Sequence, residues 1–200
     1  MSTVGLEKAI IGAGGFAREI RAALGLPYIK FFVDEEYQKV ESNIFGLSQF
    51  DPEKYEVVVA IGDPTDRANM VNKLPKNTQY FTFIDPSVQL HDNNIQIGEG
   101  SIICAGTIIT TNVTIGKHAH LNLLTTIGHD TQIGNYFTTA PGSKISGNNT
   151  IKDRVYFGTN SSTKEKINIC SDVIIGSNAT VVKDINESGV YVGTPAKKIK

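Results

Sequence analysis

The chain lacks a surplus of charge of either sign and lacks long apolar runs. Its 200 residues include 19 basic and 20 acidic side chains, so the formal net charge is −1. A balanced charge creates no long-range field to capture nucleic acid or anionic lipid, and a small-molecule ligand is favoured instead. No apolar stretch approaches the roughly 20 residues that cross a bilayer, and the N-terminus shows no secretory signal. We therefore expect a cytoplasmic protein with neither a nucleic-acid nor a membrane partner.

A period of six residues dominates the second half of the sequence. Every sixth position from Ile97 to Val181 forms a column in which thirteen of fifteen residues are apolar, whereas a 40% apolar composition would give six. A second column, two residues before each of these, is mostly small or β-branched and lies on the same strand face. The pairs between strands are rich in Gly, Asn and Asp, which tolerate the positive φ of tight corners. The pattern predicts a parallel β-helix with three strands and 18 residues per coil, in about five coils.

A different pattern precedes the repeat. An apolar strand at residues 9–11 leads into Gly12, Gly14 and Ala17, which form G-x-G-x-x-A ahead of a helix predicted to start near Arg18. Such a loop either aims backbone N–H groups at a phosphate or is a tight structural turn. The remaining predicted elements are a strand ending near Asp34, a strand at residues 55–62, a helix from about residue 63 and a short strand at residues 80–84. These residues make only one mononucleotide-binding half, which argues against a dehydrogenase. The predicted domains are residues 1–85, a Rossmann-like α/β half domain, and residues 86–200, the β-helix with its C-terminal tail.

Several segments in a fixed order carry a resemblance to a known family. The segments are "IIGAGGFAREI", "AIGD", "IDPSV", "HAHLNLLTTIGHDTQIGNY" and "GVYVGTPAKKIK". In this order they resemble the sugar O- and N-acetyltransferases of the sialic-acid and bacillosamine acetyltransferase type. The resemblance implies that the α/β domain holds a nucleotide-linked amino sugar, with a UDP-4-amino sugar as the expected substrate. It also implies a left-handed β-helix that forms a homotrimer and holds acetyl-CoA between neighbouring subunits, without a metal.

His129 and Asp130 are the catalytic residues that this resemblance implies. His129 matches the general base, and Asp130 matches the acidic neighbour that increases its basicity. Both fall at a corner of the predicted β-helix, so their side chains should leave the prism rather than fill it. Histidine, with an unperturbed pKa of roughly 6.5, accepts a proton at cellular pH, and a carboxylate on its other nitrogen fixes the tautomer. From spacing alone, a solvated turn is the alternative. Aspartate is one methylene shorter than the glutamate of many relatives, so its reach to the ring is open.

The binding residues are also transferred from the resemblance, position by position. The acetyl-CoA contacts fall on Thr138, Gly147, Thr159 and Ser177. The nucleotide-sugar contacts fall on Gly14, Gly15, Phe16, Asp34, Glu35 and Gly62, with Phe16 standing where relatives commonly have histidine. Lys197, Lys198 and Lys200 form either a solvated basic terminus or contacts to coenzyme phosphates.

Corners 18 residues apart stack into three columns of different character. The column with Lys117-His118 and Asp153-Arg154 is polar and mostly charged, which predicts a solvated edge. A second column carries His129-Asp130. The third is uncharged and places Leu123 and Leu124 where a monomer would expose them, which predicts a subunit contact.

Histidine and cysteine positions argue against a zinc site and against a disulfide. His118 and His120 raise the possibility of the γ-class carbonic anhydrase site, but stepping 36 residues from His91 reaches Ile127, which cannot ligate zinc. Cys104 and Cys170 lie outside any C-x-x-C spacing, and their separation is not a multiple of 18, so they should occupy different walls as thiols. Two other functions remain open: sugar O-acetylation of the sialic-acid type, and a non-catalytic sugar-nucleotide-binding module.

Overall fold

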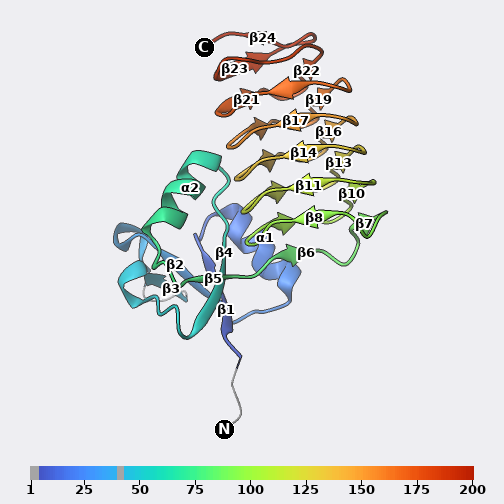
Figure 1. Ribbon diagram of the computed structural model, residues 1–200. Coiled ribbons are helices and arrows are strands. Elements are labelled where there is room, and N and C mark those ends of the chain that lie inside the picture. Colours follow the sequence, from blue (N-terminus) through green and yellow to red (C-terminus); the bar gives the residue numbers. More distant parts are fainter. Residues whose placement is uncertain (1–4, 40–42) are drawn as a thin grey trace. The chain divides into compact units, whose positions relative to one another are not determined.

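The computed structural model describes residues 5–39 and 43–200. The chain forms two compact units, the first made of residues up to Gly62 together with Asp66–Phe81, and the second of Asp63–Thr65 together with Thr82–Lys200 (Figure 1). Within the described residues, neither of the helices combines the length and apolarity needed to cross a membrane.

The first unit is a parallel sheet with helices between its strands. Its strand order is β3-β2-β1-β4-β5, as in a Rossmann-like half, and all its strand pairs are parallel. Ala9, Ile10 and Ile11 on the central strand are fully buried on both faces, as parallel strands covered on two sides require. The elements are β1 (Glu7–Ile11), α1 (Gly15–Leu24), β2 (Lys30–Val33), η1 (Glu35–Tyr37), β3 (Ile44–Gly46), η2 (Leu47–Gln49), β4 (Tyr55–Val59), α2 (Pro64–Lys73) and β5 (Gln79–Tyr80).

Three boundaries differ from the sequence-based prediction. Strand β4 ends at Val59 rather than at residue 62. Helix α1 begins at Gly15 rather than near Arg18, because Gly14 takes an extended conformation as the N-cap and the helix starts directly after it. The strand predicted at residues 80–84 is two strands in different sheets. Phe81 N–H donates to Val57 O in the first sheet, whereas Phe83 N–H donates to Ser101 O of the β-helix. The apolar pattern of residues 80–84 does not show that the backbone changes its hydrogen-bonding partner within this segment.

The second unit is a left-handed β-helix with three walls of parallel strands, visible as stacked coils in Figure 1. Partner strands lie 18 residues apart, as in the pairing of Ile109 with Ile127 and of Ile115 with Ile133, so the predicted coil length is confirmed. The first wall contains β6 (Phe83–Ile84), β9 (Ile102–Ile103), β12 (His120–Leu121), β15 (Thr138–Thr139), β18 (Tyr156–Phe157), β21 (Val173–Ile175), β23 (Gly189–Val192) and the antiparallel β24 (Lys197–Lys198). The second contains β7 (Gln89–Leu90), β10 (Ile108–Ile109), β13 (Thr126–Ile127), β16 (Lys144–Ile145), β19 (Ser162–Thr163) and β22 (Thr180–Val181). The third contains β8 (Gln96–Ile97), β11 (Thr114–Ile115), β14 (Gln132–Ile133), β17 (Thr150–Ile151) and β20 (Asn168–Ile169).

The two inward columns and the corners follow the predicted repeat. Both columns supply the core of the prism, in which Phe137, Val155 and Phe157 are fully buried. The second residue of each corner has a positive φ from Gly100 to Asn178, at every sixth position. Asn and Asp fill several of these sites because they tolerate the left-handed conformation. The corners therefore direct the first residue of each pair, and often the second, out of the prism.

Candidate functional site

The corner between β13 and β14 presents His129 and Asp130 outside the prism. Asp130 takes a φ of 58°, and the side chains of His129 and Asp130 are 57% and 46% exposed. The Nδ1 atom of His129 lies 2.7 Å from Oδ2 of Asp130, so the shorter aspartate reaches the ring. Because an ionised carboxylate accepts, Nδ1 is the donor of this pair, and in the neutral tautomer of this ring Nε2 carries the lone pair.

The other oxygen of the Asp130 carboxylate is also occupied. Nδ2 of Asn112, one coil earlier at the same corner, donates to Oδ1 of Asp130 over 2.7 Å. This amide, and secondly the hydrogen bond from His129, lower the pKa of the Asp130 carboxyl below its usual value. Asp130 is therefore a carboxylate at neutral pH and an acceptor toward both neighbours.

A glycine one coil later leaves room for the imidazole. A Cβ atom at Gly147 would lie 2.7 Å from Nε2 of His129 and 2.9 Å from its Cδ2 and Cε1 atoms. These distances are shorter than any normal contact, so the ring occupies the space that a side chain at position 147 would need. Asn112, His129-Asp130 and Gly147 thus form one stack along a single corner.

The four expected coenzyme contacts lie at different places on the β-helix. Gly147 is at the corner of His129, whereas Thr159 and Ser177 are exposed at the next corner, on the other side of the wall that contains β16 and β19. Thr138 lies on β15 and is buried. Within one chain, then, the structure brings only Gly147 next to His129.

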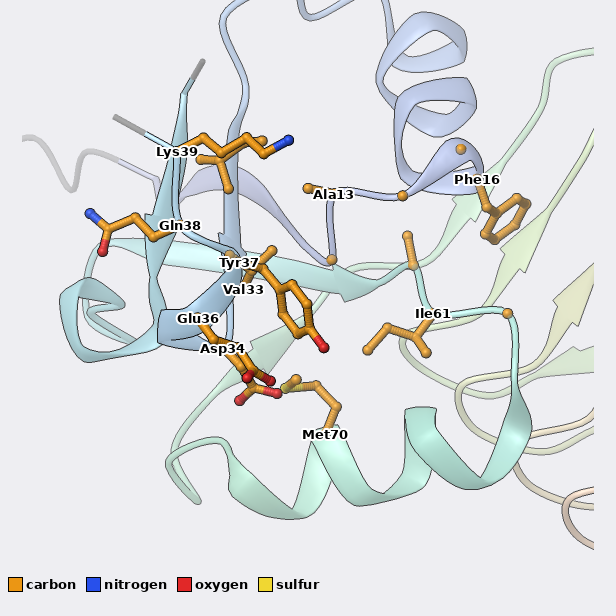
Figure 2. A pocket seen from close by; sticks show the side chains of 16 residues that line it. Ala13, Phe16, Val33, Asp34, Glu36, Tyr37, Gln38, Lys39, Ile61 and Met70 are labelled. Atoms are coloured by element: carbon orange, nitrogen blue, oxygen red, sulfur yellow. The ribbon is translucent and has the colours of Figure 1, made fainter. Parts of the chain in front are cut away.

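A cavity of about 630 Å³ lies within the first unit, at the carboxyl ends of β1, β2 and β4 (Figure 2). It is bounded by the loop Gly12–Phe16, by residues 33–34 and 36–39, and by residues 60–62, with Met70 of α2. Gly12 adopts a φ of 98°, and a Cβ there would lie 3.2 Å from the carbonyl oxygen of Ala60. Only glycine permits this close turn, which carries the chain into the N-terminus of α1 beside the cavity. Backbone N–H groups at a helix N-terminus favour an anion such as phosphate.

Five of the six expected nucleotide-sugar residues line this cavity, and Glu35 does not. The five are Gly14, Gly15, Phe16, Asp34 and Gly62. Asp34 also receives both 3.1 Å hydrogen bonds from Nζ of Lys73. The Glu35 carboxylate instead accepts a hydrogen bond from Ser48 N–H over 2.8 Å, so it faces away from the cavity.

Other residues that line the cavity could not be predicted from the sequence. Figure 2 shows the Tyr37 ring directed toward Ile61 and Met70, with the Glu36 and Asp34 carboxylates on the same side. The negative charge of Glu36 raises the pKa of the Tyr37 phenol, which therefore stays protonated as a hydrogen-bond donor. The 3-10 helix η1 positions these residues. A segment of three residues is too short to show a periodic pattern, so the sequence could not reveal which side chain faces the cavity.

The column predicted to be a solvated edge is partly packed. His118 is only 3% exposed, and its ring stacks on that of Tyr136 with centroids 5.3 Å apart and planes at 10°. The prediction was wrong here because a pair of flat rings one coil apart stack and exclude water. His120 is also buried. Among residues 5–39 and 43–200, no group of three or more His, Cys, Asp or Glu side chains is placed to hold a metal ion. Cys104 and Cys170 are both thiols, and no disulfide joins them in the described chain.

An α/β unit joined to a hexapeptide β-helix defines the class of protein, and comparisons with known proteins show which proteins the chain resembles. Residues 9–74 match the family model of the PglD N-terminal domain. A GDP-perosamine N-acetyltransferase of Escherichia coli O157:H7 is 29% identical over 174 residues, which cover 79% of this chain and 78% of that protein.

Two solved structures extend this likeness over nearly the whole chain. WeeI from Acinetobacter baumannii AYE aligns with a TM-score of 0.88 and 27% identity, covering 98% of this chain and 100% of that one. The acetyltransferase domain of PglB from Neisseria gonorrhoeae FA1090, in complex with acetyl coenzyme A, aligns with a TM-score of 0.84 and 26% identity over the same shares. Over nearly its whole length the chain is thus similar to hexapeptide-repeat sugar acetyltransferases, and it is an acetyltransferase.

Proposed function

We propose that the protein transfers the acetyl group of acetyl-CoA to the amino group of a nucleotide-linked amino sugar. One observation carries this proposal: an exposed histidine at a β-helix corner, with its Nδ1 held by an ionised carboxylate. The related GDP-perosamine N-acetyltransferase supports the amino-sugar substrate, and the PglB domain bound to acetyl coenzyme A supports the acyl donor.

His129 acts as the general base in this proposal. The sugar nitrogen attacks the thioester carbonyl carbon, a carbon–nitrogen bond forms and the carbon–sulfur bond breaks. Nε2 of His129 accepts the proton that the nitrogen loses, and the protonated ring then returns a proton to the departing sulfur. Asp130 stabilises the imidazolium between these two steps, as the carboxylate of a triad does.

The cavity of the first unit holds the nucleotide part of the substrate. The N-terminus of α1, at Gly14, Gly15 and Phe16, meets the phosphates through backbone N–H groups. Asp34 and the protonated Tyr37 phenol supply an acceptor and a donor for the nucleoside. We retain a UDP-4-amino sugar as the expected substrate. Because the relative from E. coli is a GDP-perosamine N-acetyltransferase, the nucleotide base of the substrate is the first feature to test.

A homotrimer completes the coenzyme site. Gly147 lies at one corner of the prism, and Thr159 and Ser177 lie at another. A groove between two copies brings residues of two different corners to one ligand. Leu123 and Leu124 are 42% and 65% exposed in an uncharged column, which supports contact between subunits along that edge.

Thiol release from acetyl-CoA tests the proposal. The assay uses UDP-, dTDP- and GDP-linked 4-amino-6-deoxy sugars, with matched 4-hydroxy sugars and a sialic acid as acceptors. We expect thiol release with an amino sugar only. The nucleotide whose amino sugar gives the highest kcat/KM is the one that the enzyme prefers. Turnover of the hydroxyl acceptors alone would support sugar O-acetylation, and binding of all sugar nucleotides without thiol release would support a non-catalytic binding module.

A further inference from the structure

We propose that Asn112 is a positioning residue for the acetyl transfer, because it clamps the carboxylate that orients the catalytic imidazole. This inference rests on the proposed roles of His129 and Asp130. It adds a residue 17 positions before His129 in the sequence, on the preceding coil of the β-helix.

The hydrogen bonds at this corner fix the whole carboxylate. Oδ1 of Asp130 accepts from Nδ2 of Asn112, and Oδ2 accepts from Nδ1 of His129, each over 2.7 Å. A carboxylate held at one oxygen can still rotate about its Cβ–Cγ bond, whereas one held at both oxygens has a fixed plane. The plane of the Asp130 carboxylate therefore sets the direction of the Nδ1–H bond and, through it, the direction of Nε2.

Exposure makes this clamp necessary. The Asp130 side chain is 46% exposed, so water competes for both of its oxygens. Neighbouring side chains do not enclose a carboxylate that is exposed to this degree, whereas a charged acceptor forms the stronger class of hydrogen bond. Asn112 thus supplies by hydrogen bonding the orientation that burial supplies in a closed active site.

Asparagine suits position 112 for both backbone and side-chain reasons. Its φ is 52°, a conformation that asparagine tolerates better than most residues. Its backbone N–H donates to Oδ2 of Asp92 over 3.3 Å, which ties it to the coil before. The amide is neutral, so it donates to Asp130 without altering the charge of the pair, whereas an aspartate would place a second carboxylate against the first.

The same corner provides a matched control. Asn148 lies one coil after Asp130, with a φ of 57° and an exposed side chain. Asn112→Gly and Asn148→Gly both keep a residue that accepts a positive φ, and both remove one exposed side chain. Only the first removes a hydrogen bond to Asp130.

Steady-state kinetics form the first arm of the test. We expect Asn112→Gly to lower kcat about tenfold, a part of the 10² to 10⁴ that positioned proton transfer is worth, with both KM values unchanged within about twofold. Asn148→Gly should leave kcat unchanged. In an Asp130→Gly background, which keeps a residue that accepts the positive φ but has no acceptor for Asn112, Asn112→Gly should have no further effect. Wild-type kcat in Asn112→Gly, or an equal loss with and without the Asp130 carboxylate, would overturn the proposal.

Imidazole NMR of the protein alone forms the second arm and needs no turnover. The chain has four histidines, and the resonances missing from His129→Ala identify His129. We expect the Nδ1–H tautomer in the wild type and in Asn148→Gly, and a larger share of the Nε2–H tautomer in Asn112→Gly. An unchanged tautomer in Asn112→Gly would overturn the clamp even if the enzyme is active. Absence of acetyl transfer in the wild type would refute the proposed function instead, and the NMR result would still decide the role of Asn112.

Discussion

A single methyl group at position 147 should displace the imidazole ring of His129, the proposed general base. Gly147→Ala places Cβ 2.7 Å from Nε2 of His129, whereas non-bonded heavy atoms are at their optimal separation at about 3.5 to 4.0 Å. The ring must therefore retreat by roughly 0.8 Å or more. A misplacement of about 1 Å can cost about 10²-fold in rate, so we expect kcat to fall roughly 10- to 100-fold.

The backbone should accept this substitution. The φ of Gly147 lies outside the left-handed range, so alanine introduces no backbone strain, and it restricts the unfolded chain. We therefore expect a normal melting temperature together with the loss of kcat. Because Gly147 is also an expected acetyl-CoA contact, the KM for acetyl-CoA separates the two roles: a raised KM with unchanged kcat indicates a clash with coenzyme alone.

The control is Gly147→Ala in a variant that lacks the His129 imidazole. In a His129→Ala background the methyl group has no imidazole to displace, and Gly147→Ala should leave the residual kcat unchanged. Wild-type kcat in the single variant, or an equal loss in both backgrounds, would refute the argument from ring displacement.

Three further substitutions test the core, an ion pair and the subunit contact. Phe157→Ala removes a fully buried ring from the prism, and urea titration should show a loss of about 3 to 5 kcal/mol; a loss below about 1 kcal/mol would contradict the packing. Asp172→Asn removes the bidentate pair with Arg154, whose guanidinium lowers the pKa of Asp172. That carboxylate therefore stabilises the fold above the usual carboxyl pKa of about 3.9, and the contribution is lost as the pH falls through the lowered folded-state value. Because the two side chains are 33% and 46% exposed, the deficit at neutral pH should stay below about 1 kcal/mol and disappear in acid; an equal deficit at acid pH would contradict the pairing. Leu123→Glu should convert the proposed trimer to monomer on a sizing column, and an unchanged elution volume would count against that edge as the contact.

The repeat was predictable because its physics is local and periodic. Inward side chains alternate with corners every six residues. The spacing alone therefore predicts that Ile109, Ile127 and Ile145 stack in one buried column. A positive φ at every corner explains why Asn and Asp recur there, although bulky residues such as Leu124 and Tyr136 adopt it as well. The repeat imposes that conformation even where the residue type disfavours it.

The parts that sequence could not supply depend on contacts between coils or on short irregular segments. Asn112 reaches Asp130 only because 18 residues make one coil, and nothing local marks that amide as a donor to that carboxylate. The 3-10 helix η1 turns Glu35 toward Ser48 and Tyr37 toward the cavity, an orientation that three residues cannot encode in a pattern. The split of residues 80–84 between two sheets depends on partner strands in different units.

The most direct test of the central claim is the turnover of His129→Ala against His91→Ala, an exposed histidine at the start of the β-helix. With acetyl-CoA and the preferred amino sugar, kcat should fall roughly 10²-fold or more in His129→Ala while acetyl-CoA binding and the melting temperature hold. His91→Ala should match the wild type. Near-normal kcat in His129→Ala would contradict the assignment of this corner as the acid–base centre.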